Sequence, residues 1–376
     1  MKDQLKIIVA IGATLLATLP IKGMRGDIPL HKAVSLGDLA AVTRLVREGV
    51  DINTWNEDGD TPLHYSVRGG DLVMVALFLK NGGDLEAQDS YGNRPLHDAV
   101  LSGNLDMVTF LLEEGADIKA QDNYGFTPLH DAVRMDNLEI VKLLLEKGAN
   151  PEARNENGDT PLLRAVQSGN LEIITHLLEK GADREARNEN GDTSLHRAVY
   201  MGKLAIVTHL LEKGVDPEAR NNAGDRPLHD AVRTGDLAIV THLLEKGVDP
   251  EVQNNDGFTP LHDAIRRSNL EIVTLLLEKG ADPEVPDNNG NTPLHYAVQG
   301  AGSAEIWRRP QAIACVRALL AAGAALKEDE PFVTSVLPPC QPQRYLQSQR
   351  APRPTGRQGA DQSICQPRIA LFDTAS

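Results

Sequence analysis

The sequence predicts an all-α solenoid, built from short helix-turn-helix units that stack on one another. The main observation is a four-residue motif, TPLH or a close variant, which begins at residues 28, 61, 94, 127, 160, 193, 226, 259 and 292, always 33 residues apart. A fixed period of this length is characteristic of repeat proteins. The second observation is the low aromatic content, 4% of the chain, which suits many thin layers better than one deep core.

The first 22 residues differ from the units that follow. Lysines flank an uncharged, apolar run from Ile7 to Ile21. A basic start followed by a short apolar stretch is typical of a signal peptide, and the run is short for a membrane span of about 20 residues. We expect residues 1–22 to be a signal peptide or an N-terminal apolar anchor, with a degenerate capping half-unit as a further alternative. A signal would make the protein secreted or periplasmic, whereas the alternatives would leave it membrane-anchored or cytoplasmic.

Residues 122–154, DNYGFTPLHDAVRMDNLEIVKLLLEKGANPEAR, show how one unit is built. Thr127 is a good helix N-cap, and Pro128 suits the first helical position because no amide hydrogen is needed there. Leu129, Ala132 and Val133 fall on one face of this first helix. The second helix is predicted to stop at Gly148, and its apolar residues are Leu138, Ile140, Val141, Leu144 and Leu145.

Glycines in register predict where the helices and turns end. One set stands after the first helix, where glycine adopts the left-handed conformation at little cost: Gly37, Gly70, Gly103, Gly169, Gly202 and Gly235. A second set lies in the turn before each motif, and Asn-Gly and Asp-Gly favour tight turns: Gly59, Gly92, Gly125, Gly158, Gly191, Gly224, Gly257 and Gly290. Each unit therefore reads turn, helix, turn, helix, and it can bury its apolar face only against its neighbours.

These units resemble the ankyrin repeat family, whose motif is T-P-L-H-x-A in a 33-residue repeat. The match covers residues 23–326 in nine copies, and the ninth carries an insertion near residues 300–312. The resemblance implies an ankyrin-repeat α-solenoid of helix-turn-helix units with projecting β-hairpin turns, and a concave surface that binds other proteins. It also implies that the motif histidines tie adjacent units together: His31, His64, His97, His130, His196, His229, His262 and His295. Leu163 and Ser194 depart from the motif in units five and six, so we expect the weakest interface there.

The last part of the chain has a different composition. Residues 327–376 are rich in Pro and Gln with little apolar periodicity, and we expect a disordered tail. Cys315 occupies a position where other units have a core isoleucine, so a buried thiol is expected. Cys340 and Cys365 lie in the tail, and their spacing leaves open whether they pair.

The charge of the chain argues against nucleic acid as a partner. The net charge is −15, and both ends carry a small positive balance, so the acidic excess lies in the repeats. Such a surface repels phosphate backbones. A membrane contact is expected only if the N-terminal segment is retained.

No catalytic or metal-binding pattern stands out. His130 next to Asp131 could orient an imidazole base, but the same motif returns in register, and this indicates a structural role. His176, His209 and His242 recur on the second helix, yet stacked helices lie about 8 to 10 Å apart, too far for nitrogens that must approach one ion to about 2 Å. We predict no enzymatic activity, no metal and no cofactor.

Two sets of polar contacts are expected on the units. The pairs Asp131 with Arg134, Asp230 with Arg233 and Asp263 with Arg266 are spaced as ordinary surface ion pairs on the first helix. Across the turns, Arg154, Arg187 and Arg220 lie opposite Asp159, Asp192 and Asp225, whereas Gln121 and Gln253 face Phe126 and Phe258. Because the two positions change together we expect cross-turn contacts, although recent duplication of one unit would give the same pattern.

The scarce aromatic residues mark the expected partner-binding surface, because aromatic and arginine side chains contribute most of the energy of interfaces. They occupy turn and first-helix positions, mainly in units two to four, beside a row of arginines, although packing on neighbouring turns is the alternative. The residues are Trp55, Tyr65, Tyr91, Tyr124, Phe126, Arg154, Arg187, Tyr200, Arg220 and Phe258. We expect a monomeric, non-enzymatic scaffold that binds a protein through turn tips and the concave face. The alternative is a membrane-tethered or exported spacer or regulator that modulates a partner enzyme.

Overall fold

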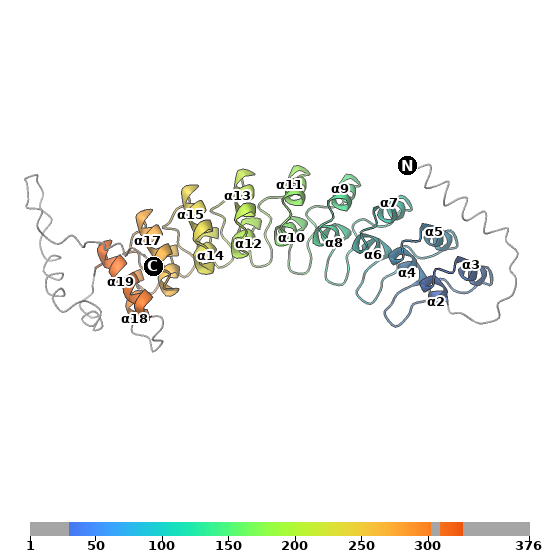
Figure 1. The fold of residues 1–376 in the computed structure, drawn as a ribbon, viewed down its shortest axis with the longest axis horizontal. Helices are drawn as coiled ribbons and strands as arrows, with labels where there is room; N and C mark the ends of the chain where they lie inside the picture. The colour runs from blue at the N-terminus through green and yellow to red at the C-terminus, as the bar shows by residue number, and fades with distance from the viewer. Residues whose placement is uncertain (1–29, 302–308, 326–376) are drawn as a thin grey trace, which may run out of the picture. The chain divides into compact units, whose positions relative to one another are not determined.

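The computed structural model describes residues 30–301 and 309–325 (Figure 1). The expected signal or anchor at 1–22, part of the insertion, and the tail with Cys340 and Cys365 lie outside the described residues. The chain divides into two compact parts, Met1–Ala324 and Ala325–Ser376, and the first part holds the helices described below. In these described residues every regular element is a helix, and the helices form nine helix-turn-helix pairs. The all-α repeat architecture is therefore confirmed.

The first helix of each unit begins where the motif predicts. In unit four, α8 (Pro128–Arg134) follows Thr127, whose hydroxyl accepts a hydrogen bond from the His130 amide at 3.4 Å. Proline stands at the first helical position in most of these helices, where its missing amide hydrogen costs nothing. The other first helices are α2 (Leu30–Ser35), α4 (Pro62–Arg68), α6 (Pro95–Leu101), α10 (Pro161–Ser168), α12 (Ser194–Tyr200), α14 (Pro227–Thr234), α16 (Pro260–Arg266) and α18 (Pro293–Ala301).

Most of the second helices start at a side-chain cap. In α9 (Leu138–Glu146), for example, the Asn137 side chain accepts a hydrogen bond from the Ile140 amide at 3.1 Å. The glycine before such a cap has a positive φ, as predicted, and Asp136 and Ser268 take the same conformation in units four and eight. The other second helices are α3 (Leu39–Arg47), α5 (Leu72–Lys80), α7 (Leu105–Glu113), α11 (Leu171–Glu179), α13 (Leu204–Glu212), α15 (Leu237–Glu245), α17 (Leu270–Glu278) and α19 (Arg309–Ala321).

The core lies between two layers of helices that run along a single row. Each first helix packs on the second helix of its own unit and on the first helices of the neighbouring units. The apolar face of α8, with Leu129, Ala132 and Val133, is fully buried. Within this part of the chain, Figure 1 shows first helices along one side of the row and second helices along the other. None of the described helices has the length and apolar character needed to span a membrane.

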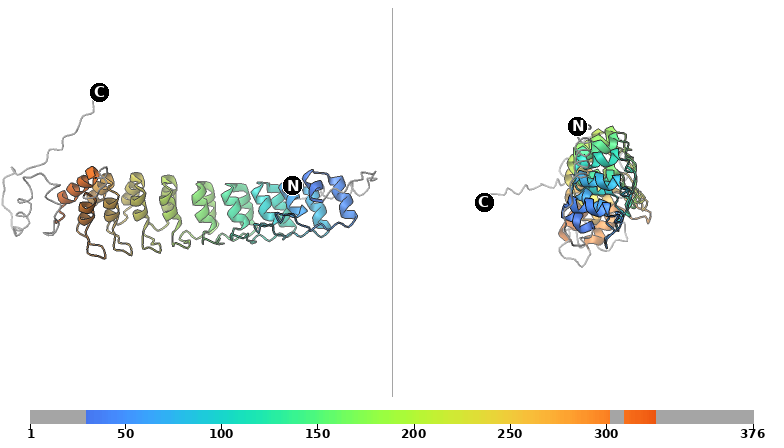
Figure 2. Two further views of the ribbon diagram at one scale, coloured as in Figure 1. Left: turned by 90° about the horizontal axis from the view of Figure 1, so that it is seen from below. Right: turned by 90° about the vertical axis from the view of Figure 1, so that its right-hand side faces the viewer.

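The turns project from one edge of the row (Figure 2) but contain no β-strand in the described residues. The expected β-hairpins are instead tight turns, each joined to the next by one backbone hydrogen bond. The Asn123 amide donates to the Tyr91 carbonyl at 2.9 Å, and the Glu156 amide to the Tyr124 carbonyl at 3.0 Å. Gly125 has φ 76°, and a Cβ there would lie 2.9 Å from the next turn's backbone. Glycine is therefore required for both conformation and close approach.

Candidate functional site

The motif histidines link adjacent units, as His130 shows. The Thr127 amide donates to His130 Nδ1 at 3.1 Å, so the imidazole proton is on Nε2, which lies 3.1 Å from the Asp159 carbonyl oxygen of the next unit. Burial lowers the pKa of His130 to about 4. The same bond to the next turn confirms the structural role expected for His31, His64, His97, His196, His229 and His262.

Unit five lacks this link, because Leu163 replaces the histidine. Leu163 is fully buried, so an apolar side chain fills the space. The Thr160 amide then has no imidazole acceptor, and the Asp192 carbonyl in the next turn receives no side-chain bond from this helix. The departure from the motif thus removes one polar contact at the start of α10 and one between units five and six.

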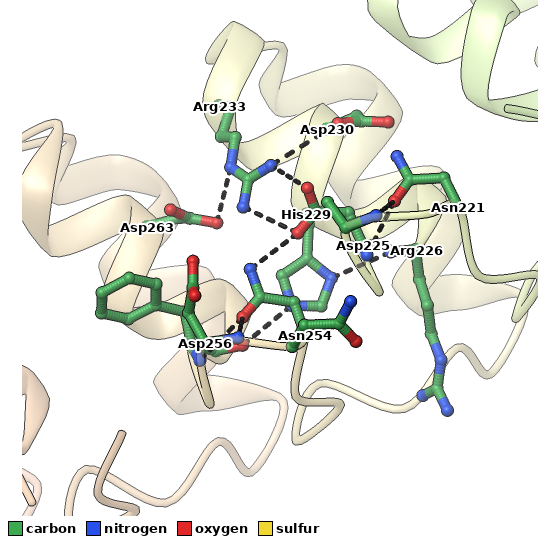
Figure 3. Close-up of polar contacts among 12 residues, drawn as sticks. Asn221, Asp225, Arg226, His229, Asp230, Arg233, Asn254, Asp256 and Asp263 are labelled. Carbon is green, nitrogen blue, oxygen red and sulfur yellow. Dashed lines mark hydrogen bonds and ion pairs between the residues drawn. The ribbon is translucent and has the colours of Figure 1, made fainter. Parts of the chain in front are cut away.

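Arginine and aspartate side chains form a network along the first helices. Arg233 Nη2 donates to Asp225 Oδ1 at 2.8 Å, and its Nε donates to Asp263 Oδ2 at 2.9 Å (Figure 3). Asn254 also donates to Asp225, at 2.8 Å. Burial acts to raise the pKa of Asp225, but the hydrogen bonds from Arg233 and Asn254 outweigh it and hold the pKa below its usual value.

The expectation of ordinary surface pairs on the first helix is only partly correct. Asp131 and Arg134 do pair, at 3.0 Å, but Asp131 is buried, and burial raises its pKa to about 6 despite Arg134. Asp263 is also buried and pairs with Arg233 of the preceding unit, while Arg266 lies over the Phe258 ring, 5.1 Å from its centroid. Asp131 therefore pairs within its own helix, whereas Asp263 joins two adjacent units.

Arg154 and Arg187 make the expected cross-turn contacts, but to backbone carbonyls and not to the aspartates opposite them. Arg154 Nη1 donates to the carbonyls of Gly158 and Arg187, and does not pair with Asp159. Arg197 binds both oxygens of Asp159 at 2.9 Å. Arg187 likewise donates to the carbonyls of its own and the next turn, and so do Gln121 and Gln253. The residue at this position of the turn has a long side chain that donates hydrogen bonds to two adjacent turns. The contact therefore does not depend on which residue lies opposite. Arg220, in the same row, is exposed.

Three of the expected partner-binding aromatics are half-buried and pack against neighbouring groups. Phe126 meets His130 edge to face at 5.8 Å, and Arg164 lies over its ring at 5.2 Å. The Phe258 ring packs on the rings of His262 and Tyr296, with ring centroids 5.5 and 5.6 Å apart. Tyr65 packs on His31 at 6.0 Å, and its hydroxyl accepts from Asn56 at 3.1 Å. Their rings stabilise contacts within the array.

The other four expected aromatics are exposed. Trp55, Tyr91, Tyr124 and Tyr200 have 75%, 60%, 52% and 73% of their surface accessible. Tyr91 and Tyr124 stand on adjacent turns, whose backbones are hydrogen-bonded to each other. Trp55 lies in the turn of unit two, and Tyr200 at the end of α12. The structure thus brings Tyr91 and Tyr124 together and leaves Tyr200 apart from them.

Two polar hollows, which the sequence did not indicate, border exposed tyrosines. One, of about 600 Å³, is lined by Tyr91 and Arg68 together with Asp58, Asp60, Asp89 and Asp98. The other, of about 680 Å³, includes Tyr200, Arg197, Asp159, Glu189, Asp192 and Asp230. In each hollow four carboxylates face one arginine, so both favour positive charge. The sequence feature that could have located them is the in-register recurrence of aspartate at the motif and turn positions.

The second helices carry no metal site in the part of the chain that the structure describes. His209 Nε2 lies 2.8 Å from Thr175 Oγ1 of the preceding unit, and His242 Nε2 lies 3.3 Å from Thr208 Oγ1. These histidines are contacts between units. Cys315 is buried as expected, and burial raises the pKa of its thiol to about 11.

Comparison with known proteins places this geometry in context. A family model described as ankyrin repeats, three copies, matches residues 30–122, 147–221 and 228–329, and a single ankyrin repeat model matches residues 124–156. Among solved structures, the chain is similar to the ankyrin repeat domain of Bcl-3, described as a unique member of the IkappaB protein family. The two share 32% sequence identity with a TM-score of 0.53, over 59% of this chain and all of that one. A comparison with curated proteins found no significant match.

Proposed function

Because this chain belongs to the ankyrin repeat family, whose repeats generally mediate protein-protein interaction, we propose that it is a non-enzymatic scaffold that binds a partner protein. The observation that carries the proposal is the pair of exposed tyrosines on adjacent turns, Tyr91 and Tyr124. Tyrosine is enriched in interfaces because its ring supplies apolar area and its hydroxyl supplies a hydrogen bond. The motif histidines support a non-enzymatic role, because both ring nitrogens are already used in bonds between units.

The proposed docking surface consists of the turn tips and first helices of units two to four. The backbone bonds of Asn123 to Tyr91 and of Glu156 to Tyr124 hold the two tips in fixed register. A surface that is rigid before binding loses little conformational entropy on association. Trp55 lies at the edge of this surface, and the row of Arg154, Arg187 and Arg220 extends it along the turns.

A double substitution tests this surface. A partner is first identified by affinity purification with the full chain, and its affinity is then measured for Tyr91→Ala/Tyr124→Ala. We expect binding to weaken by at least about tenfold, because interface tyrosines are frequent hot spots. The matched control is Leu204→Ala/Leu237→Ala, which removes partly exposed apolar side chains from the second helices. Helical circular dichroism should be unchanged in both variants. Equal partner affinity in the two double variants would refute the docking surface.

A further inference from the structure

Two units hold an arginine between a pair of carboxylates from consecutive units. Arg233 lies between Asp225, which ends the turn before its own helix, and Asp263, on the first helix of the next unit (Figure 3). Arg68 lies in the same way between Asp60 and Asp98, with Nε 3.0 Å from Asp98 Oδ2. The two sites are five units apart, so this arrangement is a recurring property of the repeat.

Unit six has the same two carboxylates but no arginine between them. Asp192 and Asp230 stand 33 residues before Asp225 and Asp263, and Tyr200 stands 33 residues before Arg233. The Tyr200 side chain is turned out to solvent. Asp192, Tyr200 and Asp230 all line the hollow of about 680 Å³. The place that a guanidinium occupies in units two and seven is therefore open in unit six.

Among the residues that the structure describes, no arginine takes over that place. Arg197 lines the same hollow, but Nη2 is directed to both oxygens of Asp159 at 2.9 Å. The nearest ion-pair distance of Asp230 is 3.9 Å, to Arg233 Nη1, which already binds Asp225. Asp192 accepts a bond from the neutral Asn221 amide at 2.9 Å. In the described residues Asp192 therefore has no ion pair, and Asp230 has only this long one, with an arginine that also binds Asp225 and Asp263.

We propose that the hollow between Asp192 and Asp230 binds an arginine side chain of a partner protein, in the position that Arg68 and Arg233 occupy in their own units. A guanidinium suits this place better than an ammonium, because its planar fork donates to two carboxylates at once. The exposed Tyr200 ring can then cover the guanidinium face. The inference rests on the proposed function only for the source of the arginine, since the chemistry of the hollow is a property of this chain alone.

The first test uses defined peptides and the full chain at pH 8, where Asp230 is ionised. The probes are Ac-Gly-Gly-Arg-Gly-Gly-amide, the same peptide with citrulline, which has the shape of arginine without its charge, and the same peptide with lysine. Side-chain carboxyl signals of Asp192 and Asp230 are followed by NMR. The arginine peptide should shift both signals and bind at least about tenfold more tightly than the citrulline peptide. Equal binding of arginine and citrulline, or an arginine peptide that shifts neither signal, would overturn the proposal.

A pair of substitutions at one position provides the matched control. Tyr200→Arg restores the arginine of units two and seven, so it should fill the hollow and abolish binding of the arginine peptide. Tyr200→Gln leaves the hollow open and should retain binding. Tyr200→Arg should also raise the melting temperature above that of Tyr200→Gln and lower the pKa of Asp230, which burial, followed by the charge of Asp225, raises to about 7. A Tyr200→Arg protein that still binds the peptide as well as Tyr200→Gln would contradict the inference.

This outcome is separable from that of the proposed docking surface. If the arginine peptide binds but the Tyr91/Tyr124 variant retains full partner affinity, the hollow is an arginine site and the docking surface is wrong. If the peptide does not bind but the double variant loses its partner, the docking surface stands and the arginine site is refuted.

Discussion

Arginines at the same position of different units have different ion-pair partners. Arg68 and Arg233 each reach an aspartate 30 residues further on, in the next unit. Arg134 occupies the same position, but the residue 30 positions on is Arg164, and Arg134 pairs with Asp131 on its own helix. The sequence predicted the structural role of the histidines because one motif repeats in register. It could not predict the arginine partners, because they depend on the residues present in two units at once.

The buried histidines make stability sensitive to mild acid. The pKa of His130 is about 4 in the folded protein, against about 6.5 for an unperturbed histidine. Between these values the unfolded chain binds more protons, so the free energy of unfolding decreases as the pH falls from 6.5 towards 4. A shift of this size corresponds to about 2 kcal/mol lost between pH 7 and pH 5. Leu163, which stands at this position in unit five, does not titrate and so makes no pH-dependent contribution to the free energy of unfolding.

We therefore predict that His130→Leu reduces the pH dependence of stability. At pH 7 the variant should be less stable by about 1 to 3 kcal/mol, because the Asp159 carbonyl and the Thr127 amide lose their partner. Between pH 7 and pH 5 it should lose about 2 kcal/mol less than the parent protein. Asp131, whose raised pKa has the opposite effect, contributes equally to both proteins. Urea unfolding at both pH values measures the difference, and identical pH dependence would show that His130 is not buried in its neutral form.

Local sequence signals were sufficient to predict the helices but not the form of the turns. Thr-Pro starts and glycine ends predicted the first helices, because these residues satisfy the backbone at helix termini. The turns were predicted less well, since the ankyrin resemblance implied β-hairpins. The turn from Asp122 to Phe126 is closed by a 2.9 Å backbone bond and shares one bond with each neighbouring turn. Such sparse pairing is too little to form a strand.

Among the second helices from α3 to α17, one lacks the side-chain cap that the others have. Lys203 precedes α13 and makes no side-chain bond to the helix start, whereas Asp236 at the same position before α15 accepts from the Ala238 and Ile239 amides at 3.1 Å. We predict that Lys203→Asn raises the free energy of unfolding by about 1 kcal/mol, because an asparagine side chain can accept hydrogen bonds from the first amides of α13, as Asp236 does at the start of α15. Asp236→Lys should lower it by a similar amount. Thermal unfolding of both variants measures the change. No change in the free energy of unfolding, or a change of the same sign in both variants, would contradict the capping argument.

At the scale of the whole array, the closely packed pairs of described helices belong either to one unit or to two units that are neighbours in the sequence. The first helices pack on the first helices before and after them, and several second helices also pack on one another, for example α7 on α9 and α15 on α17. Stability is then close to a sum of unit and interface terms, so one weak interface opens without the rest. The sequence predicted this linear arrangement from its period. The hollow beside Tyr200 was not predicted, because its carboxylates come from units five, six and seven.

The centre of the array should open before its flanks. Leu163 removes a histidine link, Ser194 replaces the proline at a helix start, and Lys203 removes a cap, all within units five and six. The Arg197 pair with Asp159 and the hydrogen bond from Lys203 Nζ to the Gln167 carbonyl, at 2.9 Å, still join these units.

We predict that amides of α10 to α13 exchange with deuterium sooner than those of α6 to α9 and α14 to α17 in the native full chain. Comparison with units on both sides separates this effect from fraying at the ends of the array. Leu163→His combined with Lys203→Asn should slow exchange in α10 to α13 and leave α6 and α16 unchanged, because coupling in a linear array decays with distance from the altered interface. Equal protection along α6 to α17 in the parent protein would show that the three departures are fully compensated by packing.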